Sequence, residues 1–195
     1  MPKPLSHAEI DAFRERLCNV AEEMFAAHGP DGVTLRQLTA ALGVSSMTPY
    51  RYFKDKDAIL AAVRARAFNR FADAIGKADS RRRDGDAYFA FARAHPAAYR
   101  MMFDTQQPTF TAYPELLKAM DRARRMLSTG KLSALAAKGW RPKDINLHAL
   151  TFWSILHGAV MLELAGAYTP PLSAREVARP ALDAFWVAVG LSERD

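Results

Sequence analysis

Residues 35–56 read LRQLTAALGVSSMTPYRYFKDK, and this stretch decides the fold that we predict for the whole chain. Its leucines recur at the spacing of one helix face and stop before Gly43, where a short helix would end. Thr34 precedes this helix and Gln37 follows three residues later, so the pair predicts a capping box at the helix start. A serine pair then opens a second predicted helix over residues 46–53. The pattern indicates a helix-turn-helix, whose second helix reads the DNA major groove.

The side chains of the second predicted helix suit nucleic acid. Tyrosine hydroxyls and a lysine beside a helix N-terminus can donate to phosphate oxygens, whereas short polar side chains, methionine and arginine can contact base edges. The stretch 35–56 holds four basic residues against one acidic residue, a net charge of +3. An ordinary solvated helical hairpin with buried tyrosines would share the spacing alone. The residues that we expect to contact DNA are Thr34, Arg36, Ser46, Met47, Thr48, Tyr50, Arg51, Tyr52 and Lys56.

Extended to TLRQLTAALGVSSMTPYRYFKDKDAIL, the stretch resembles the DNA-binding signature of the TetR family of transcriptional regulators. The preceding FAAHGPDGVT resembles the exit from that family's first helix, and the likeness covers about residues 1–60. Its specific positions are Gly29, Gly32, Thr34, Leu38, Gly43, Val44, Tyr50, Phe53, Lys56 and Leu60. Pro49 departs from the pattern, because many relatives carry a bulky aliphatic residue there. We expect Pro49 to remove about one backbone hydrogen bond and to change little else.

Composition places the chain among soluble globular proteins. Its 195 residues are 50% hydrophobic, which suffices for a core, and the single cysteine, Cys18, excludes an internal disulfide and fits a reducing cytoplasm. Residues 1–7 lack a signal-peptide pattern, and the uncharged stretch 145–162 contains several polar residues. We therefore expect a cytoplasmic protein without a membrane span. The net charge of +6 does not locate the DNA site, since residues 1–60 alone carry a net charge of −1.

Apolar periodicity predicts an all-α chain, and no stretch alternates as a strand would. The nine predicted helices cover about residues 8–28, 35–42, 46–53, 55–78, 86–94, 96–103, 115–138, 144–167 and 173–190. Residues 1–56 form a predicted helix-turn-helix DNA-binding domain, and residues 57–195 form a helical domain for effector binding and dimerisation. We expect residues 80–85 to form a loop. Ser173 and Glu176 suggest a capping box for the last helix, which either kinks at Pro180 or begins there.

The second half resembles the family in a less specific way. WSILHGAVMLELAG, residues 153–166, resembles a tryptophan–histidine–glycine segment in the C-terminal lobe of one TetR subgroup. The resemblance implies a homodimer, formed by a bundle of the last two helices, and a pocket for a small apolar effector. Candidate effector-binding residues are Phe89, Tyr99, Phe103, Met120, Trp153, His157 and Met161. Candidate dimer residues are Leu182, Phe185, Trp186 and Val189. Plain core packing is the alternative explanation for the candidate effector-binding residues.

Catalytic and metal-binding patterns are absent from the sequence. It contains no glycine-rich phosphate loop and no Gly-x-Ser-x-Gly elbow, and His148 and His157 have no cysteines or paired acids nearby. We therefore predict a non-enzymatic protein without cofactor or metal. The favoured function is a TetR-type repressor that binds a palindromic double-stranded operator as a homodimer and is released by its effector. The alternatives are an effector-independent activator or architectural DNA-binding protein, and a helical enzyme or carrier.

Overall fold

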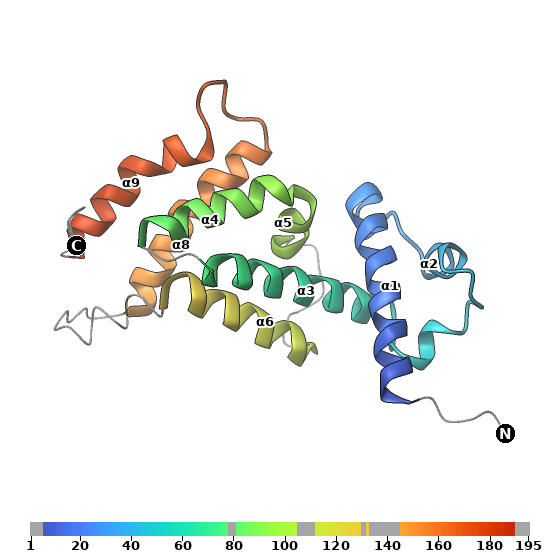
Figure 1. Ribbon diagram of the computed structural model, residues 1–195. Helices are drawn as coiled ribbons and strands as arrows, with labels where there is room; N and C mark the ends of the chain where they lie inside the picture. The colour runs from blue at the N-terminus through green and yellow to red at the C-terminus, as the bar shows by residue number, and fades with distance from the viewer. Residues whose placement is uncertain (1–5, 78–80, 105–111, 130–131, 133–144, 190–195) are drawn as a thin grey trace. The chain divides into compact units, whose positions relative to one another are not determined.

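A computed structural model describes residues 6–77, 81–104, 112–129, 132 and 145–189 of the chain. Every regular element in these ranges is helical, which confirms the predicted all-α class (Figure 1). The eight α-helices described there are α1 (His7–His28), α2 (Leu35–Ala41), α3 (Lys56–Gly76), α4 (Arg81–Ala94), α5 (Pro96–Phe103), α6 (Pro114–Arg124), α8 (Ile145–Leu164) and α9 (Ala174–Ala188). The remaining predicted helix, over residues 46–53, is not an α-helix.

The chain divides into two compact units. The first unit comprises Met1–Phe68 and Ala97–Met120, and the second comprises Asn69–Pro96 and Asp121–Asp195. Helices α3 and α6 each begin in the first unit and end in the second, so each unit is built from separated parts of the chain. The proposed domain boundary after residue 56 stays a prediction.

Helix α1 supplies one wall of the core of the first unit. It begins with a capping box that the sequence reading missed: the Glu9 backbone N–H donates to Ser6 Oγ at 3.3 Å, and the Ser6 N–H donates to Glu9 Oε2 at 2.7 Å. The helix ends at Gly29, whose φ of 71° suits glycine. The core side chains are Phe13, Leu17, Cys18, Ala21, Phe25, Val33, Leu38, Phe53, Ile59, Leu60, Val63 and Met101. Burial raises the pKa of the Cys18 thiol, as expected for a packed cysteine.

The first unit also buries a charged side chain. Arg64 of α3 is 1% exposed, and its Nη2 donates to the backbone carbonyl of Met102 at 2.9 Å. Met102 lies in the last turn of α5, where carbonyl groups lack helical partners and the helix dipole favours a positive charge. Burial lowers the pKa of Arg64, and the nearby charge of Asp104 raises it. Arg64 therefore joins the middle of α3 to the C-terminal end of α5.

The second unit packs α4 against α8 and α9. The indole Nε1 of Trp153 on α8 donates to the hydroxyl of the fully buried Tyr88 on α4 at 3.1 Å. The ring of Phe152 lies 5.6 Å from that of Phe185 and 5.2 Å from that of Trp186, which joins α8 to α9. Aromatic side chains thus link α8 to both α4 and α9.

Helix α4 begins earlier than predicted. The expected loop over residues 80–85 is wrong, because the helix runs from Arg81 and includes Gly85. A Cβ at Gly85 would lie 3.7 to 3.9 Å from Leu156, Phe89 and Leu182, so tertiary packing surrounds this position. Arginine is also a good helix former, and such packing outweighs the low helix propensity of one glycine.

Helix α9 begins at Ala174 and continues through Pro180, which resolves the alternative between a late start and an internal proline. The predicted capping box is wrong. Ser173 hydrogen-bonds the side chain of Glu176 but caps no backbone N–H. The first N–H of the helix, that of Ala174, instead donates to Glu163 Oε1 on α8 at 3.3 Å. A carboxylate from a neighbouring helix thus takes the role of the local cap.

The long helix predicted over residues 115–138 changes geometry along its length. Helix α6 ends at Arg124 and continues as a π-helical turn over Arg125–Thr129. Most of the remaining predicted segment lies outside the described residues.

Candidate nucleic-acid interface

Helix α2 follows the sequence prediction closely. Its capping box is confirmed: the Thr34 N–H donates to Gln37 Oε1 at 2.7 Å, and the Gln37 N–H donates to Thr34 Oγ1 at 3.3 Å. Gly43 ends the turn after α2 with a φ of 67°, a left-handed conformation that glycine adopts without strain. Thr34 therefore acts as the N-cap of α2, and its hydroxyl also donates to Gln37 Oε1 at 2.7 Å. Its predicted contact to DNA stays a prediction. Arg36 is exposed on the same helix.

The recognition segment, residues 46–53, is not the α-helix that we predicted. Its regular part is a single 3₁₀ turn over Pro49–Arg51. The Arg51 N–H donates to the Thr48 carbonyl at 3.2 Å, and the Tyr52 N–H donates to the Pro49 carbonyl at 2.9 Å. Proline has no N–H to donate to the preceding turn, so an α-helical hydrogen bond cannot form at this position. The segment therefore tightens into a 3₁₀ turn at Pro49, although the Phe53 N–H also donates to the Pro49 carbonyl at 2.9 Å, which is α-helical spacing.

The recognition segment has a buried side and an exposed side. Pro49 and Phe53 are buried, and Phe53 belongs to the core of the first unit. Met47 and Tyr50 are 66% and 53% exposed although both are large and largely apolar. The remaining predicted contacts on the segment follow the same division: Ser46 and Arg51 are exposed and Thr48 is half-buried. Most of the side chains that we predicted to meet bases or phosphates are therefore accessible.

Two predicted DNA contacts point toward the protein. The ring of Tyr52 stacks on Phe13 of α1, with centroids 4.1 Å apart. Lys56 Nζ donates to the carbonyls of Pro30 at 2.9 Å and Val33 at 3.1 Å. These contacts connect the recognition segment and the start of α3 to α1 and to the loop before α2. A role of Tyr52 and Lys56 in contacting DNA stays a prediction, whereas their contacts within the fold are direct.

We expect Lys56→Met to lower the free energy of unfolding by about 2 kcal/mol, because two partly buried carbonyls lose a charged donor. Chemical denaturation of both proteins would measure the change. Lys54→Met is the matched control: Lys54 is exposed, and we expect a change below about 0.5 kcal/mol. Unchanged stability of Lys56→Met together with weaker binding to every DNA sequence would contradict this role and assign Lys56 to a phosphate.

The candidate effector residues are divided between the two units. Tyr99, Phe103 and Met120 belong to the first unit, and the Tyr99 and Phe103 rings lie 4.9 Å apart. The others, Phe89, Trp153, His157 and Met161, belong to the second unit. Phe89 and Tyr99 are 4% and 0% exposed, so both contribute to core packing. An effector role for these residues stays a prediction.

His157 is the titratable member of this set. Its ring lies 5.6 Å from that of Trp153, one helical turn earlier on α8. Burial lowers the pKa of His157, since an apolar environment disfavours the charged imidazolium. The neutral imidazole is therefore the form that this environment favours at neutral pH.

The predicted dimer residues on α9 largely face their own chain. Phe185 and Val189 are 8% and 3% exposed, and Leu182 and Trp186 are half-buried. Other apolar side chains of the last two helices are accessible, namely Leu147, Leu150, Met161, Leu162, Val177 and Val187. Helix α8 is, among the described residues, the one helix long and apolar enough to cross a membrane, a test that core helices of soluble proteins also pass. With only 28% of its most apolar window buried, α8 presents a broad accessible surface.

Two family models match the chain. The model described as "Bacterial regulatory proteins, tetR family" matches residues 17–63, which include α2 and the recognition segment. The model described as "Tetracyclin repressor-like, C-terminal domain" matches residues 82–185, which run from α4 into α9.

Individual proteins show the same likeness. The uncharacterized HTH-type transcriptional regulator Rv0681 of Mycobacterium tuberculosis is 26% identical over 164 residues, covering 78% of this chain and 71% of the relative. The HTH-type transcriptional repressor Rv1474c of the same organism is 36% identical over 63 residues, covering 32% of this chain and 33% of the relative. A solved structure of a protein of unknown function from Rhodococcus sp. RHA1 shares 28% identity and a TM-score of 0.75, covering 97% of this chain and all of that one.

Proposed function

The chain belongs to the TetR family of DNA-binding transcriptional regulators, and we propose that it is a homodimeric repressor that a small apolar effector releases from a palindromic operator. The observation that carries the proposal is the exposure of Met47, Tyr50 and Arg51 on the recognition segment. Repression is supported by the likeness to Rv1474c, which is named a repressor. We place the protein in the cytoplasm, where its DNA would lie.

The exposed side chains of the recognition segment would contact the bases. Arg51 can donate two hydrogen bonds to a guanine edge, whereas Ser46, Met47 and Thr48 offer short polar and apolar contacts. The Tyr50 hydroxyl and Arg36 suit phosphate oxygens, which position the protein without reading sequence. A single turn presents few side chains, so each half of the operator would be read over a short run of base pairs.

The test is selection of bound duplexes from a random pool at two salt concentrations. An enriched inverted repeat, bound more weakly as salt rises, is the expected result for a two-fold-symmetric repressor. Salt-sensitive binding without an enriched sequence would instead identify an architectural DNA-binding protein. The selected operator then serves as the probe in a screen of small apolar compounds, and release of that probe identifies an effector.

Arg51→Ala should relax the base preference at one position in each half-site, with a loss of about 1–3 kcal/mol of discrimination there. Competition between the selected operator and single-position variants would measure this loss. Tyr50→Phe removes only a hydroxyl and should weaken binding to all sequences alike. If Arg51→Ala kept the full preference at every position, another residue of the segment would have to read the bases.

The dimer is supported by the accessible apolar side of the last two helices. Leu147, Leu150 and Leu162 on α8 and Val187 on α9 are each 49% or more exposed in the single chain. An apolar surface of this kind favours burial against a partner. A second copy of the same two helices would complete a four-helix bundle and place two recognition segments on one DNA.

We infer an effector in the C-terminal region from the tryptophan–histidine–glycine segment, residues 153–158, whose resemblance also points to the subgroup of the family. Trp153 already donates to Tyr88, and the environment of His157 favours its neutral form, so an uncharged or weakly polar compound would suit these side chains better than a strong acid. Release follows when the effector binds the DNA-incompetent conformation more tightly than the competent one.

A further inference from the structure

Arg14 contacts the recognition segment from α1. Its Nη1 donates to the Tyr52 carbonyl at 3.1 Å, across 38 positions of sequence. Its guanidinium carbon lies 4.5 Å from the centroid of the Phe53 ring, within the range of a cation–π contact. Its Nη2 pairs with Glu115 Oε2 of α6 at 3.4 Å. One half-buried side chain thus holds the last two residues of the recognition segment and is itself held from α6.

The recognition segment needs such support because it is too short to hold its own orientation. One 3₁₀ turn forms few internal hydrogen bonds, and isolated turns of this length are unstable. The carbonyl of Tyr52 follows the turn, where backbone acceptors lack helical partners and a positive charge is favoured. The stacking of Tyr52 on Phe13 comes from the residue next to Arg14 on α1. Two adjacent residues of α1, Phe13 and Arg14, therefore contact the end of the segment.

We propose that Arg14 is a positioning residue for base reading, which sets the angle at which the recognition segment meets the groove. The proposal rests on the assignment of residues 46–53 as the base-reading element. Arg14 acts through the Tyr52 carbonyl and the Phe53 ring rather than by touching DNA. Without the Arg14 side chain the segment could reorient. Its contacts to base edges would then weaken, whereas its contacts to phosphates, which tolerate more motion, would remain.

The role requires a guanidinium rather than any positive charge. The planar fork of arginine presents separate N–H groups to two acceptors in fixed directions and lays a flat face on an aromatic ring. The ammonium of a lysine is a point charge that cannot maintain the Tyr52, Phe53 and Glu115 contacts together. Arg14→Lys therefore keeps the net charge, and with it the long-range attraction to DNA, while removing the positioning.

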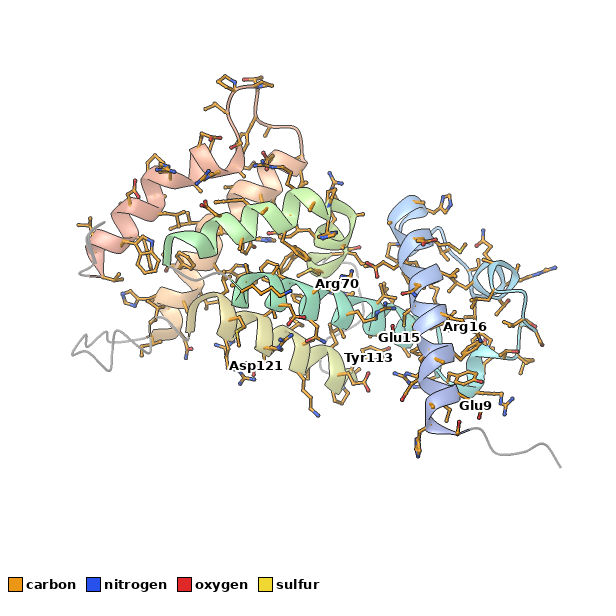
Figure 2. All side chains as sticks on the ribbon, viewed as in Figure 1. Glu9, Glu15, Arg16, Arg70, Tyr113 and Asp121 are labelled. Carbon is orange, nitrogen blue, oxygen red and sulfur yellow. The ribbon has the colours of Figure 1, made fainter. Side chains whose placement is uncertain are left out.

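The test compares affinities for the selected operator and for a random duplex of equal length. We expect Arg14→Lys to lower the ratio of these affinities about tenfold, while the affinity for the random duplex stays unchanged. Partial unfolding would scale both affinities by the same competent fraction, so the ratio responds to positioning and not to stability. Arg16→Lys is the matched control: Arg16, labelled in Figure 2, is an exposed neighbour on α1. Its guanidinium carbon lies 5.7 Å from the centroid of the Phe13 ring, a cation–π contact that the ammonium of lysine can also make, so its ratio should stay within twofold of that of the wild type.

Glu115→Gln tests the third contact. Glu115 is exposed, its side chain being 76% accessible, so its pair with Arg14 adds orientation more than stability. We expect this variant to lower the ratio about twofold to threefold, between the values for the wild type and Arg14→Lys. A ratio for Arg14→Lys within twofold of the wild type would overturn the inference. If the wild type itself showed no preferred sequence, the proposed repressor function would fail, and the inference would fall with it.

Discussion

Replacing Gly158 with glutamate should leave the single chain folded, and slightly more stable, while abolishing its dimer. Gly158 lies on the exposed side of α8, and a Cβ added there would meet no atom of the chain within 4 Å. The chain's own packing therefore does not require a glycine at this position. Glutamate is a better helix former than glycine by about 0.5–1 kcal/mol, so the isolated protomer should gain stability.

The same substitution should strongly destabilise the proposed dimer. Gly158 lies between the accessible leucines near the start of α8 and those near its end, with Leu150 and Leu162 on either side. Gly158 would let a partner helix approach this surface closely. An unpaired carboxylate buried there costs several kcal/mol, enough to weaken dimerisation by more than about a hundredfold. Operator affinity should fall by a similar factor, because the half-sites would no longer be bound by linked recognition segments.

Three measurements separate these effects. Sedimentation at micromolar concentration should give a monomer, chemical denaturation should give an equal or higher stability per chain, and operator binding should be lost. Ala90→Glu introduces the same charge at an exposed position on α4 and should change none of the three. A Gly158→Glu dimer as tight as the wild type would exclude this surface of α8 from the interface.

In the first half of the chain, the sequence predicted correctly those features that depend on residues close together in the sequence. The Thr34–Gln37 capping box and the turn at Gly43 are short-range hydrogen bonding and backbone geometry, and both were confirmed. The recognition segment was predicted less well. Ser45 Oγ accepts the Met47 N–H at 3.3 Å, but no helix begins there, and the regular part of the segment is the 3₁₀ turn that follows Thr48. The effect of a proline on a helix this short depends on the whole turn rather than on one bond.

The sequence pattern could not predict contacts between residues that lie far apart in the chain. The partner of the Ala174 N–H is Glu163, eleven positions earlier, and not the serine that a local motif predicted. Lys56 looked like a phosphate ligand, yet two carbonyls from the loop before α2 accept its hydrogen bonds. Helix α8 is apolar on nearly every side, so periodicity could not say which side faces its own chain. Arg14 gave no signal, because an arginine among charges on a helix is usually solvated.

Arg64→Met should lower the free energy of unfolding by about 3 kcal/mol, a large loss for a single substitution. Methionine fills much of the same space but cannot donate, so the Met102 carbonyl at the end of α5 loses its hydrogen bond inside the protein. The nearby charge of Asp104 also loses a favourable neighbour. Chemical denaturation would measure the difference, with the midpoint and the slope fitted separately.

Arg66→Met is the control that isolates burial. Arg66 lies two residues further along α3 and also makes polar contacts, to Asn19 Oδ1 at 2.6 Å and to Glu15 Oε2 at 3.2 Å, but its side chain is 26% exposed. Water can replace those contacts, so its loss should lower stability by about 1 kcal/mol or less. Equal losses for Arg64→Met and Arg66→Met would show that burial adds nothing to the bond with α5. The expected difference of about 2 kcal/mol would instead show that the first unit depends on a charged group at its centre, because a carbonyl cut off from water has no other donor.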